Sequence, residues 1–336
     1  MPATIKDLAR QTGLSLATIS KYLNGGKVKE NNRIAIEKAI GELGFRVNQA
    51  ARSLKTRRTK VIGFVIPELD NLFITSIVST AESELRKHGY AVMISDCGND
   101  PALEKEAVDF LIQRGAECIV NMPVSGGGEH LQSAIDQDIM VILIDRMINA
   151  LKDKVDCVLV DNLRASYDAT QCLLKKGHKE IAIIIGPREI YTSQQRLMGF
   201  FQAMLESGLT VSDANVYYSD YTIEGGYQSM TRLLKEHPEI TGVFVTNYEM
   251  TMGAVLAMNE AGVSYPEQMS VIGFDNMILS RFVKPKLTTV SQPLKEIGRA
   301  IADRIIEKLE DQAEDTGKVI MLPTSLQEGE SVRAPG

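Results

Sequence analysis

The sequence predicts an α/β protein that begins with a three-helix head and continues as a larger body of doubly wound parallel sheets. After residue 60, apolar runs alternate with amphipathic stretches of helical length, which is the pattern of right-handed βαβ units. Before residue 45, three short helical segments are separated by turns that contain glycine. Basic residues gather in this first part of the chain, while the remainder is acidic.

The charge separation divides the chain near residue 60. Residues 1–60 carry 13 Lys and Arg against four Asp and Glu, a balance of +9, whereas the whole chain has a formal net charge of -6. The other 276 residues therefore hold a balance of -15. A basic head on an acidic body predicts that the head meets a polyanion and that the body does not. Ordinary solvated helix faces would instead scatter the charge over the whole chain.

The composition limits the class of protein. With 336 residues and 44% hydrophobic content, the chain suits two or three globular domains. No stretch approaches the roughly 18 consecutive apolar residues of a membrane helix, and the N-terminus lacks the apolar region of a secretory signal, so we expect a cytoplasmic protein. The four cysteines show no CxxC pairing and the four histidines are isolated, so we expect buried free thiols, no metal site and no cofactor.

The head has the spacing of a helix-turn-helix followed by a third helix. Thr4 and Asp7 form a capping-box pattern, with a short acid in place of the usual Glu, at the start of the first helix. Gly13 permits the turn, and Ser15 can cap a second helix that carries Ile19, Leu23 and the small Ala17. The third helix, from about residue 30 to residue 43 and ended by a glycine, is expected to bury Ile34, Ile36, Ala39, Ile40 and Leu43.

A recognition helix presents the side chains of its first turns to base edges in the major groove. The second helix carries Leu16, Ala17, Thr18, Lys21 and Tyr22 in this position. Lys21 is the charged group that can reach a guanine edge or a phosphate, whereas Leu16 and Ala17 offer apolar contacts, for example to a thymine methyl. A plain solvent-facing helix is the alternative.

The stretch from Asn48 to Thr56 is short and mildly helical, and a basic run, Arg57 to Lys60, follows it. A helix of roughly nine residues is marginal alone in water, so we expect it to need support from another group. Leu54 is an apolar side chain in this basic segment, and such a residue can wedge between base steps in a minor groove. A simple interdomain linker is the alternative.

Ten apolar runs in the body predict parallel strands that are mostly buried on both faces. They are VIGFVIP, AVMISD, CIVNM, VILID, CVLVD, IAIIIG, VYYSD, VFVTN, VIGFD and TTVSQP. The helical stretches between them are 71–88, 101–114, 163–176, 194–207, 224–237, 249–261 and 294–310. Ten strands are too many for one sheet of ordinary size, so we expect two similar lobes.

Polar and aromatic side chains follow many of these strands, where ligands of doubly wound folds bind. The segments concerned are 67–73, 96–100, 145–146, 161–162, 186–196, 246–249 and 275–276. Carboxylates, amides, an arginine and aromatic faces suit a polyol or a sugar. A single Asp at a strand end serves equally well as a helix N-cap. The sequence contains none of the motifs GxGxxG after the first strand, GxxxxGK[ST], GxSxG or HExxH, so we expect no catalytic residues and no enzyme.

Six segments resemble the LacI/GalR-type bacterial transcription repressors over nearly the whole chain. They are TIKDLARQTGLSLATISKYLN, LGFRVNQAARSLK, VIGFVIP, RLMGF, SVIGFDN and LTTVSQP. The head motif together with AARSL is highly specific for that family, whereas the body alone also resembles periplasmic sugar-binding proteins. The resemblance implies a helix-turn-helix head (1–47), a hinge helix and linker (48–60), and a two-lobed periplasmic-binding-protein-like body (61–336). We expect the first lobe at about 61–161 and 291–321, and the second at about 162–290 and 322–336.

The function implied by the resemblance is repression of carbohydrate uptake or catabolism genes. A homodimer would bind a palindromic operator in double-stranded DNA, under allosteric control by a small sugar or sugar derivative. A regulator that answers a non-sugar molecule, a soluble solute-binding protein and an enzyme with a sugar-like substrate are the alternatives. The segment after Glu310 lacks the leucine heptads that would assemble four chains, which favours a dimer.

The resemblance also suggests individual roles. Expected DNA contacts are Thr4, Ser15, Leu16, Ala17, Thr18, Lys21, Tyr22, Asn24, Asn48, Ala51, Arg52, Leu54 and Lys55. Expected effector contacts are Arg196 and Asp275, followed by Phe73, Asp145, Asp161, Thr192, Asn247 and Tyr248. The chain departs from the family with Val47 for a proline before the hinge, Tyr248 for an Asp, and Ile190 for the arginine of the purine repressor. The last two changes argue against a purine effector, and residues 295–303 give no support for a phosphorylated HPr partner.

Overall fold

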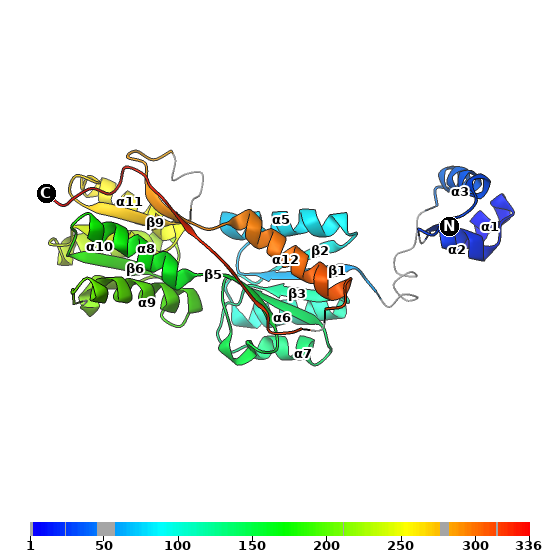
Figure 1. The fold of residues 1–336 in the computed structure, drawn as a ribbon, viewed down its shortest axis with the longest axis horizontal. Helices are drawn as coiled ribbons and strands as arrows, with labels where there is room; N and C mark the ends of the chain where they lie inside the picture. The colour runs from blue at the N-terminus through cyan, green and yellow to red at the C-terminus, as the bar shows by residue number, and fades with distance from the viewer. Residues whose placement is uncertain (1–2, 24, 46–57, 211, 276–281, 314) are drawn as a thin grey trace. The chain divides into compact units, whose positions relative to one another are not determined.

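The computed structural model of the protein describes residues 3–23, 25–45, 58–210, 212–275, 282–313 and 315–336. The chain divides into two compact units, Met1–Thr59 and Lys60–Gly336 (Figure 1). The first unit is helical and the second is an α/β body with two sheets.

Three helices form the head: α1 (Ile5–Thr12), α2 (Leu16–Leu23) and α3 (Glu30–Leu43). They share one small core built from Leu8, Ile19, Ile36 and Ala39. The Thr4 N–H donates to Asp7 Oδ2 at 2.9 Å and the Asp7 N–H donates to Thr4 Oγ1 at 3.4 Å, so the expected capping box is present. Gly13 ends α1 in the left-handed region with a φ of 66°, where a glycine is tolerated best.

Ile34 corrects the expected buried face of α3. Its side chain is 54% exposed, whereas Ile36 and Ala39 are buried and Ile40 and Leu43 pack against them. Ile34 lies two positions before Ile36, which is roughly 200° around a helix of 3.6 residues per turn. The stripe that starts at Ile36 therefore leaves Ile34 on the outer side.

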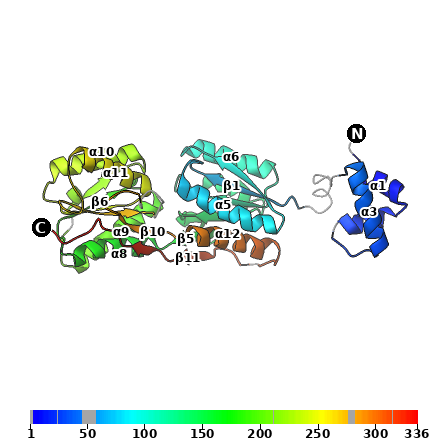
Figure 2. The same ribbon diagram turned by 90° about the horizontal axis from the view of Figure 1, so that it is seen from above.

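The first lobe of the body is a six-stranded sheet with the order β11-β5-β4-β3-β1-β2, and all its pairs are parallel. Its strands are β1 (Val61–Ile66), β2 (Ala91–Asp96), β3 (Cys118–Asn121), β4 (Met140–Ile144), β5 (Asp156–Val160) and β11 (Val319–Leu322). The helices α5 (Leu72–Lys87) and α12 (Leu294–Leu309) contribute to the core on one face of the sheet (Figure 2). The helices α6 (Pro101–Gln113) and α7 (Gln132–Ile135) contribute to the core on the other.

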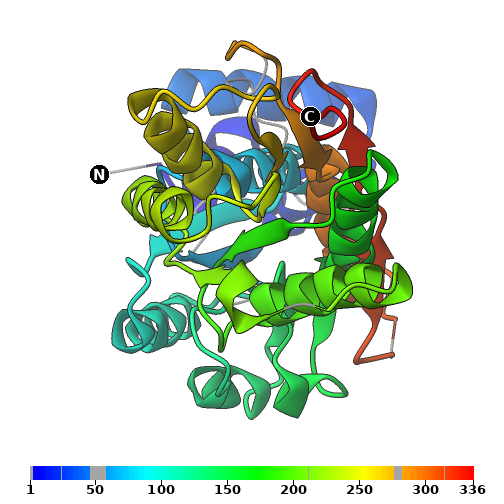
Figure 3. The same cartoon turned by 90° about the vertical axis from the view of Figure 1, so that its left-hand side faces the viewer.

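The second lobe repeats this plan with the strand order β12-β10-β9-β8-β6-β7. Its strands are β6 (Ile181–Ile185), β7 (Val216–Tyr218), β8 (Gly242–Val245), β9 (Ser270–Phe274), β10 (Thr288–Ser291) and β12 (Ser325–Gln327). The helices α8 (Asn162–Lys175) and α9 (Tyr191–Glu206) cover one face, while α10 (Ile223–Glu236) and α11 (Tyr248–Glu260) cover the other (Figure 3). Only β12 pairs in the antiparallel sense among the described strands of this sheet. The two-lobed, doubly wound fold predicted from the alternating pattern is therefore confirmed.

Two strands were absent from the sequence prediction. β11 and β12 are the sheet-edge strands at residues 319–327, and neither contains a fully buried residue. Both are short, with four and three residues, and no helix lies between them, so the alternation of strands and helices that indicated the other ten strands did not indicate these two. A smaller difference concerns α9, which begins at Tyr191 rather than at the expected Gln194.

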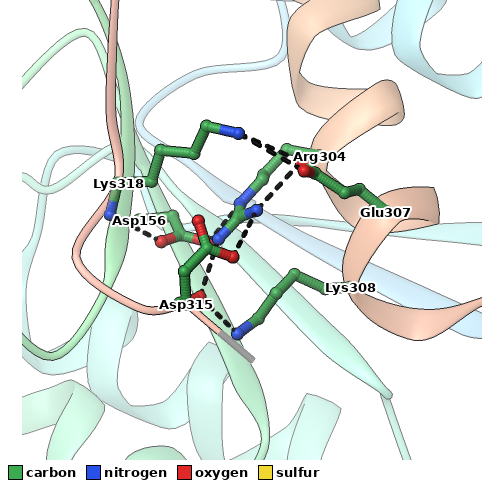
Figure 4. Close-up of polar contacts among 6 residues, drawn as sticks. All are labelled: Asp156, Arg304, Glu307, Lys308, Asp315 and Lys318. Carbon is green, nitrogen blue, oxygen red and sulfur yellow. Dashed lines mark hydrogen bonds and ion pairs between the residues drawn. The ribbon is translucent and has the colours of Figure 1, made fainter. Parts of the chain in front are cut away.

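The chain passes between the lobes three times, after β5, after β10 and between β11 and β12. An ion cluster around the buried Arg304 joins α12, β5 and the segment before β11 in the first lobe (Figure 4). Arg304 of α12 is fully buried; its Nε donates to Asp156 Oδ2 at 2.7 Å and its Nη2 donates to the Asp315 carbonyl at 2.8 Å. The Lys318 N–H donates to the other oxygen of Asp156 at 2.9 Å. The cluster thus fixes α12 and the approach to β11 against β5.

Candidate DNA-reading helix and ligand cavity

The outer side of α2 carries most of the residues expected to read DNA. Leu16 is 46% exposed, and Ala17 and Lys21 are exposed as well, while Ile19 turns inward to the head core. Ser15 caps the helix, since its Oγ accepts a hydrogen bond from the Thr18 N–H at 3.2 Å. These side chains form a continuous exposed strip on one short helix.

Tyr22 has a different place from the one expected of a base reader. Its ring packs against the head core and its hydroxyl donates to Glu37 Oε1 at 2.9 Å, so it joins α2 to α3. Thr4 is exposed and caps α1. The remaining expected DNA contacts lie outside the described residues: Asn24, Asn48, Ala51, Arg52, Leu54 and Lys55.

A cavity of about 390 Å³ opens in the body at the carboxyl ends of strands from both lobes. Its first-lobe wall comes from the segment between β1 and α5 and from the loop after β4, and its second-lobe wall from the starts of α9, α10 and α11. Seven of the eight expected effector contacts line it: Phe73, Asp145, Thr192, Arg196, Asn247, Tyr248 and Asp275. The cavity has the position that doubly wound folds use for ligands.

Asp161 is the expected effector contact that does not line this cavity. Its carboxylate accepts a hydrogen bond from the Arg164 N–H at 2.9 Å and caps α8. An aspartate at a strand end can accept hydrogen bonds from the free N–H groups of the next helix, and the Asp161 side chain is used in this way.

Arg196 and Asp275 form the buried floor of the cavity. Arg196 Nε donates to Asn162 Oδ1 at 2.8 Å, and its guanidinium lies 3.8 Å from the centre of the Phe274 ring. Asp275 Oδ1 accepts from Gln292 Nε2 at 2.6 Å. Burial raises the pKa of Asp275 to about 6, although Arg196 and Gln292 both favour its charged form. A carboxylate and a guanidinium held this firmly are preorganised for the hydroxyls of a ligand.

Four non-glycine residues on the cavity wall have left-handed backbone conformations. The φ angles are 56° at Asn99, 63° at Asp145, 69° at Tyr221 and 72° at Asp275. Such conformations cost free energy, on the order of 1 kcal/mol or more each, and they persist where the surroundings hold them. Backbone strain of this kind gathers at functional sites, which makes this cavity the candidate site of the body.

Tyr221 is a wall residue that the sequence analysis missed. Its hydroxyl lies 3.0 Å from Thr192 Oγ1 and 2.6 Å from Ser193 Oγ, and its carbonyl accepts from Asn247 Nδ2 at 3.0 Å. The predicted strand VYYSD ended at Asp220, and none of the expected site segments included the loop that follows it.

Several buried polar atoms on the cavity wall have no partner among the described residues. They are Arg146 Nε, Tyr248 Oη and Gln292 Oε1. Buried polar atoms are nearly always hydrogen-bonded, so unpaired ones at a cavity indicate that a bound molecule or water supplies the bond.

Comparisons with known proteins identify the family of both parts of the chain. Residues 4–48 match the sequence model described as "Bacterial regulatory proteins, lacI family", and residues 59–328 match "Periplasmic binding proteins and sugar binding domain of LacI family". The chain belongs to the LacI family. The transcriptional repressor PurR of Proteus mirabilis is 33% identical over 316 residues, which cover 92% of each protein. This member of the LacI family is therefore a DNA-binding transcriptional repressor with a ligand-binding body.

Solved structures have the same fold along the whole chain. A lac repressor dimer bound to operator and the anti-inducer ONPF superposes with a TM-score of 0.88 at 23% identity, over 99% of this chain and 100% of that one. A complex of the transcriptional regulator CelR with cellobiose gives a TM-score of 0.77 at 24% identity, over 98% of this chain and 99% of that one. Among the described residues no helix is long and apolar enough to cross a membrane.

Proposed function

We propose that this repressor acts in the cytoplasm on genes of carbohydrate uptake or catabolism, as a homodimer on a palindromic operator under control of a small polar effector. The observation that carries the proposal is the pairing, in one chain, of an exposed reading helix with a cavity whose walls come from two lobes. The proposed domains are a head (1–47), a hinge helix with linker (48–60) and the body (61–336).

The DNA-reading part of the proposal rests on α2. Lys21 would reach a guanine edge or a phosphate, and Leu16 and Ala17 would make apolar contacts to base edges. The family resemblance assigns Leu54 to the centre of the operator, with Ala51 and Lys55 beside it. One head reads one half-site, so two chains would be required for a palindrome.

The effector part rests on the division of the cavity between the lobes. Asn71 Nδ2, at the start of α5, donates to Glu249 Oε1, at the start of α11, at 3.1 Å. A ligand held between these two walls binds open and closed lobes with different affinity, and that difference shifts the equilibrium between them. Allosteric couplings of this kind are typically about 1–3 kcal/mol. The carboxylate, guanidinium and aromatic groups of the wall suit a sugar-like molecule.

Anisotropy titrations of the full-length chain against genomic duplexes test the DNA part. We expect some duplexes to bind at least roughly a thousandfold more tightly than random duplex, and Lys21→Ala to weaken that preference. Lys38→Ala is the matched control, because Lys38 is equally basic but lies on α3 beside Glu42. Equal binding to every duplex would refute the proposal.

A further inference from the structure

The wall of the cavity is strongly acidic. Among the described residues that line it, six carry carboxylates and two carry guanidinium groups: Glu68, Asp70, Asp145, Asp220, Glu249 and Asp275, with Arg146 and Arg196. The formal balance is four negative charges in a space of about 390 Å³. Carboxylates accept hydrogen bonds and donate none when ionised, so the wall is also rich in acceptors.

The two guanidinium groups are already engaged by the protein. Arg196 donates to Asn162 and to the Thr246 carbonyl. Arg146 Nη1 donates to the Pro123 carbonyl at 2.8 Å, and its Nε lies 3.6 Å from Asp145 Oδ2. Arg196 is therefore held by the protein, and on Arg146 the Nε beside Asp145 is a buried donor without a hydrogen-bond partner among the described residues.

Helix N-termini reduce the negative potential without reversing it. The helices α5, α9, α10 and α11 begin at the cavity, and each end is equivalent to roughly half a positive charge. Together they would offset about two of the four negative charges at most. Three of the ends are also capped from within the chain, by Asn71, Thr222 and Asn247, so their N–H groups are not free for an anion.

The acids from the two lobes meet around Glu249. Asn71 donates to it from the first lobe, and Glu68 and Asp70 lie on the same first-lobe segment. Burial, together with the charges of Glu68, Asp70 and Asp275, raises the pKa of Glu249 to about 7. The structure thus brings carboxylates from the two lobes to the place where the lobes meet. These like charges repel one another unless a cation lies between them.

Gln292 gives a second, independent indication of the ligand. Its side chain is 7% exposed, and its Nε2 is committed to Asp275 Oδ1 at 2.6 Å. Its Oε1 is buried and has no hydrogen-bond partner among the described residues, although Gln292 lines the cavity. A buried carbonyl oxygen without a donor costs free energy, so the missing partner is a donor on the ligand.

We propose that the effector of this cavity is a small polar organic cation, such as an amine-bearing sugar, whose ammonium group lies between Glu249 and the first-lobe acids Glu68 and Asp70. A hydroxyl or N–H of the same molecule donates to Gln292 Oε1. An ammonium offers three donors and no acceptor, which matches a wall of acceptors. No group of His, Cys, Asp and Glu in the described part of the chain is arranged for a metal ion, so the cation is organic. The inference rests on the proposed function, because it names the effector class of the same site.

The test is calorimetric titration of the full-length protein with sugars matched in all but charge. The probes are D-glucosamine, D-glucose and D-glucose 6-phosphate, with D-galactosamine, D-galactose and D-galactose 1-phosphate, at about pH 7.5 and constant ionic strength. We expect saturable binding of at least one amino sugar, with the neutral and phosphorylated partners of that sugar weaker by roughly tenfold or more, as for loss of a charge-assisted hydrogen bond.

Two variants connect binding to the acids. Glu249→Gln and Asp70→Asn are each expected to weaken the amino sugar by roughly tenfold. Glu260→Gln is the matched control at the other end of α11, where Glu260 accepts from the Tyr227 hydroxyl outside the cavity. A thermal unfolding scan of each variant shows whether it is folded. If one of the two acid variants fails to fold, the other still tests whether the acids bind the amino sugar.

The outcomes separate this inference from the proposed function. Absence of amino-sugar binding, unchanged binding in both acid variants, or tighter binding of a neutral or phosphorylated sugar would each overturn the cation assignment. If a neutral or phosphorylated sugar binds and alters operator affinity, the proposed function stands while the assignment falls. The operator titrations without added sugar test DNA reading on their own.

Discussion

Replacing Arg304 by Met should destabilise the body strongly. The side chain is fully buried and pairs with buried Asp156 through its Nε at 2.7 Å, while its Nη1 pairs with Glu307 and Asp315 nearer the surface. Met has a similar length, so the variant removes the charge and bonds with little change in volume. Removing one partner of a buried ion pair costs about 3–5 kcal/mol, because the other charge remains buried and unpaired.

Arg299→Met is the matched control on the same helix. Arg299 is 55% exposed in its side chain and lies 3.8 Å from Glu296, an arrangement worth at most about 1 kcal/mol. Thermal scans should show a drop in unfolding temperature of roughly 6–20 °C for Arg304→Met, taking about 2–4 °C per kcal/mol. The control should change by a few degrees at most.

A double variant tests the physical reason. Arg304→Met with Asp156→Leu should recover part of the loss, because no unpaired charge then remains in the core. Recovery should be incomplete, since the Lys318 N–H loses its acceptor on Asp156. If Arg304→Met is as stable as Arg299→Met, the buried pair contributes nothing and the reasoning fails.

Three further predictions concern the head, the cavity and the packing of the second lobe. Lys21→Ala should lower the slope of log affinity against log salt by about one in operator titrations if Lys21 contacts a phosphate, whereas an unchanged slope would place it on a base edge or off the DNA. Glu249→Gln should raise the unfolding temperature at about pH 8 but not at about pH 4. The pKa of Glu249 in the folded protein is raised to about 7, so deprotonation of this side chain lowers the stability of the folded state as the pH rises to that value, and Gln removes this loss. Equal effects at both pH values would contradict this explanation. Gly253→Ala should lower the free energy of unfolding, measured by denaturant titration, by about 1–3 kcal/mol, because a Cβ at this position of α11 would collide with the Ile223 carbonyl of α10. An unchanged midpoint would show that α10 and α11 can move apart without loss of stability.

Local chemistry determined most of the fold that the sequence predicted. The capping pair Thr4 and Asp7 and the glycine at position 13 act within a few residues, so they could be recognised without tertiary information. The buried strands were found because a strand covered on both faces needs an uninterrupted apolar run. Ile34 was misplaced because several apolar residues on α3 allow more than one stripe, and only the packing of α1 and α2 selects between them.

The cavity was predictable in position but not in composition. The segments that follow the strands were expected to meet because parallel strands bring their carboxyl ends to one edge, and the family resemblance singled out Arg196 and Asp275 within them. Tyr221 and Gln292 reach the cavity through turns whose geometry no short pattern reveals. The acidic character around Glu249 arises from two segments about 180 residues apart, so it appears only when the two lobes are folded together.

The position of β11 and β12 has a consequence for how the protein is made. A ribosome that has completed residue 318 has already released every residue of α1, α2 and α3, so the DNA-reading head can fold. At that stage β5 and β10 still have unpaired edges, because each lobe receives its sixth strand only from residues 319–327. Both lobes are therefore finished within nine residues of each other, and a chain terminated before that stretch would combine a complete head with a body open to proteolysis and aggregation.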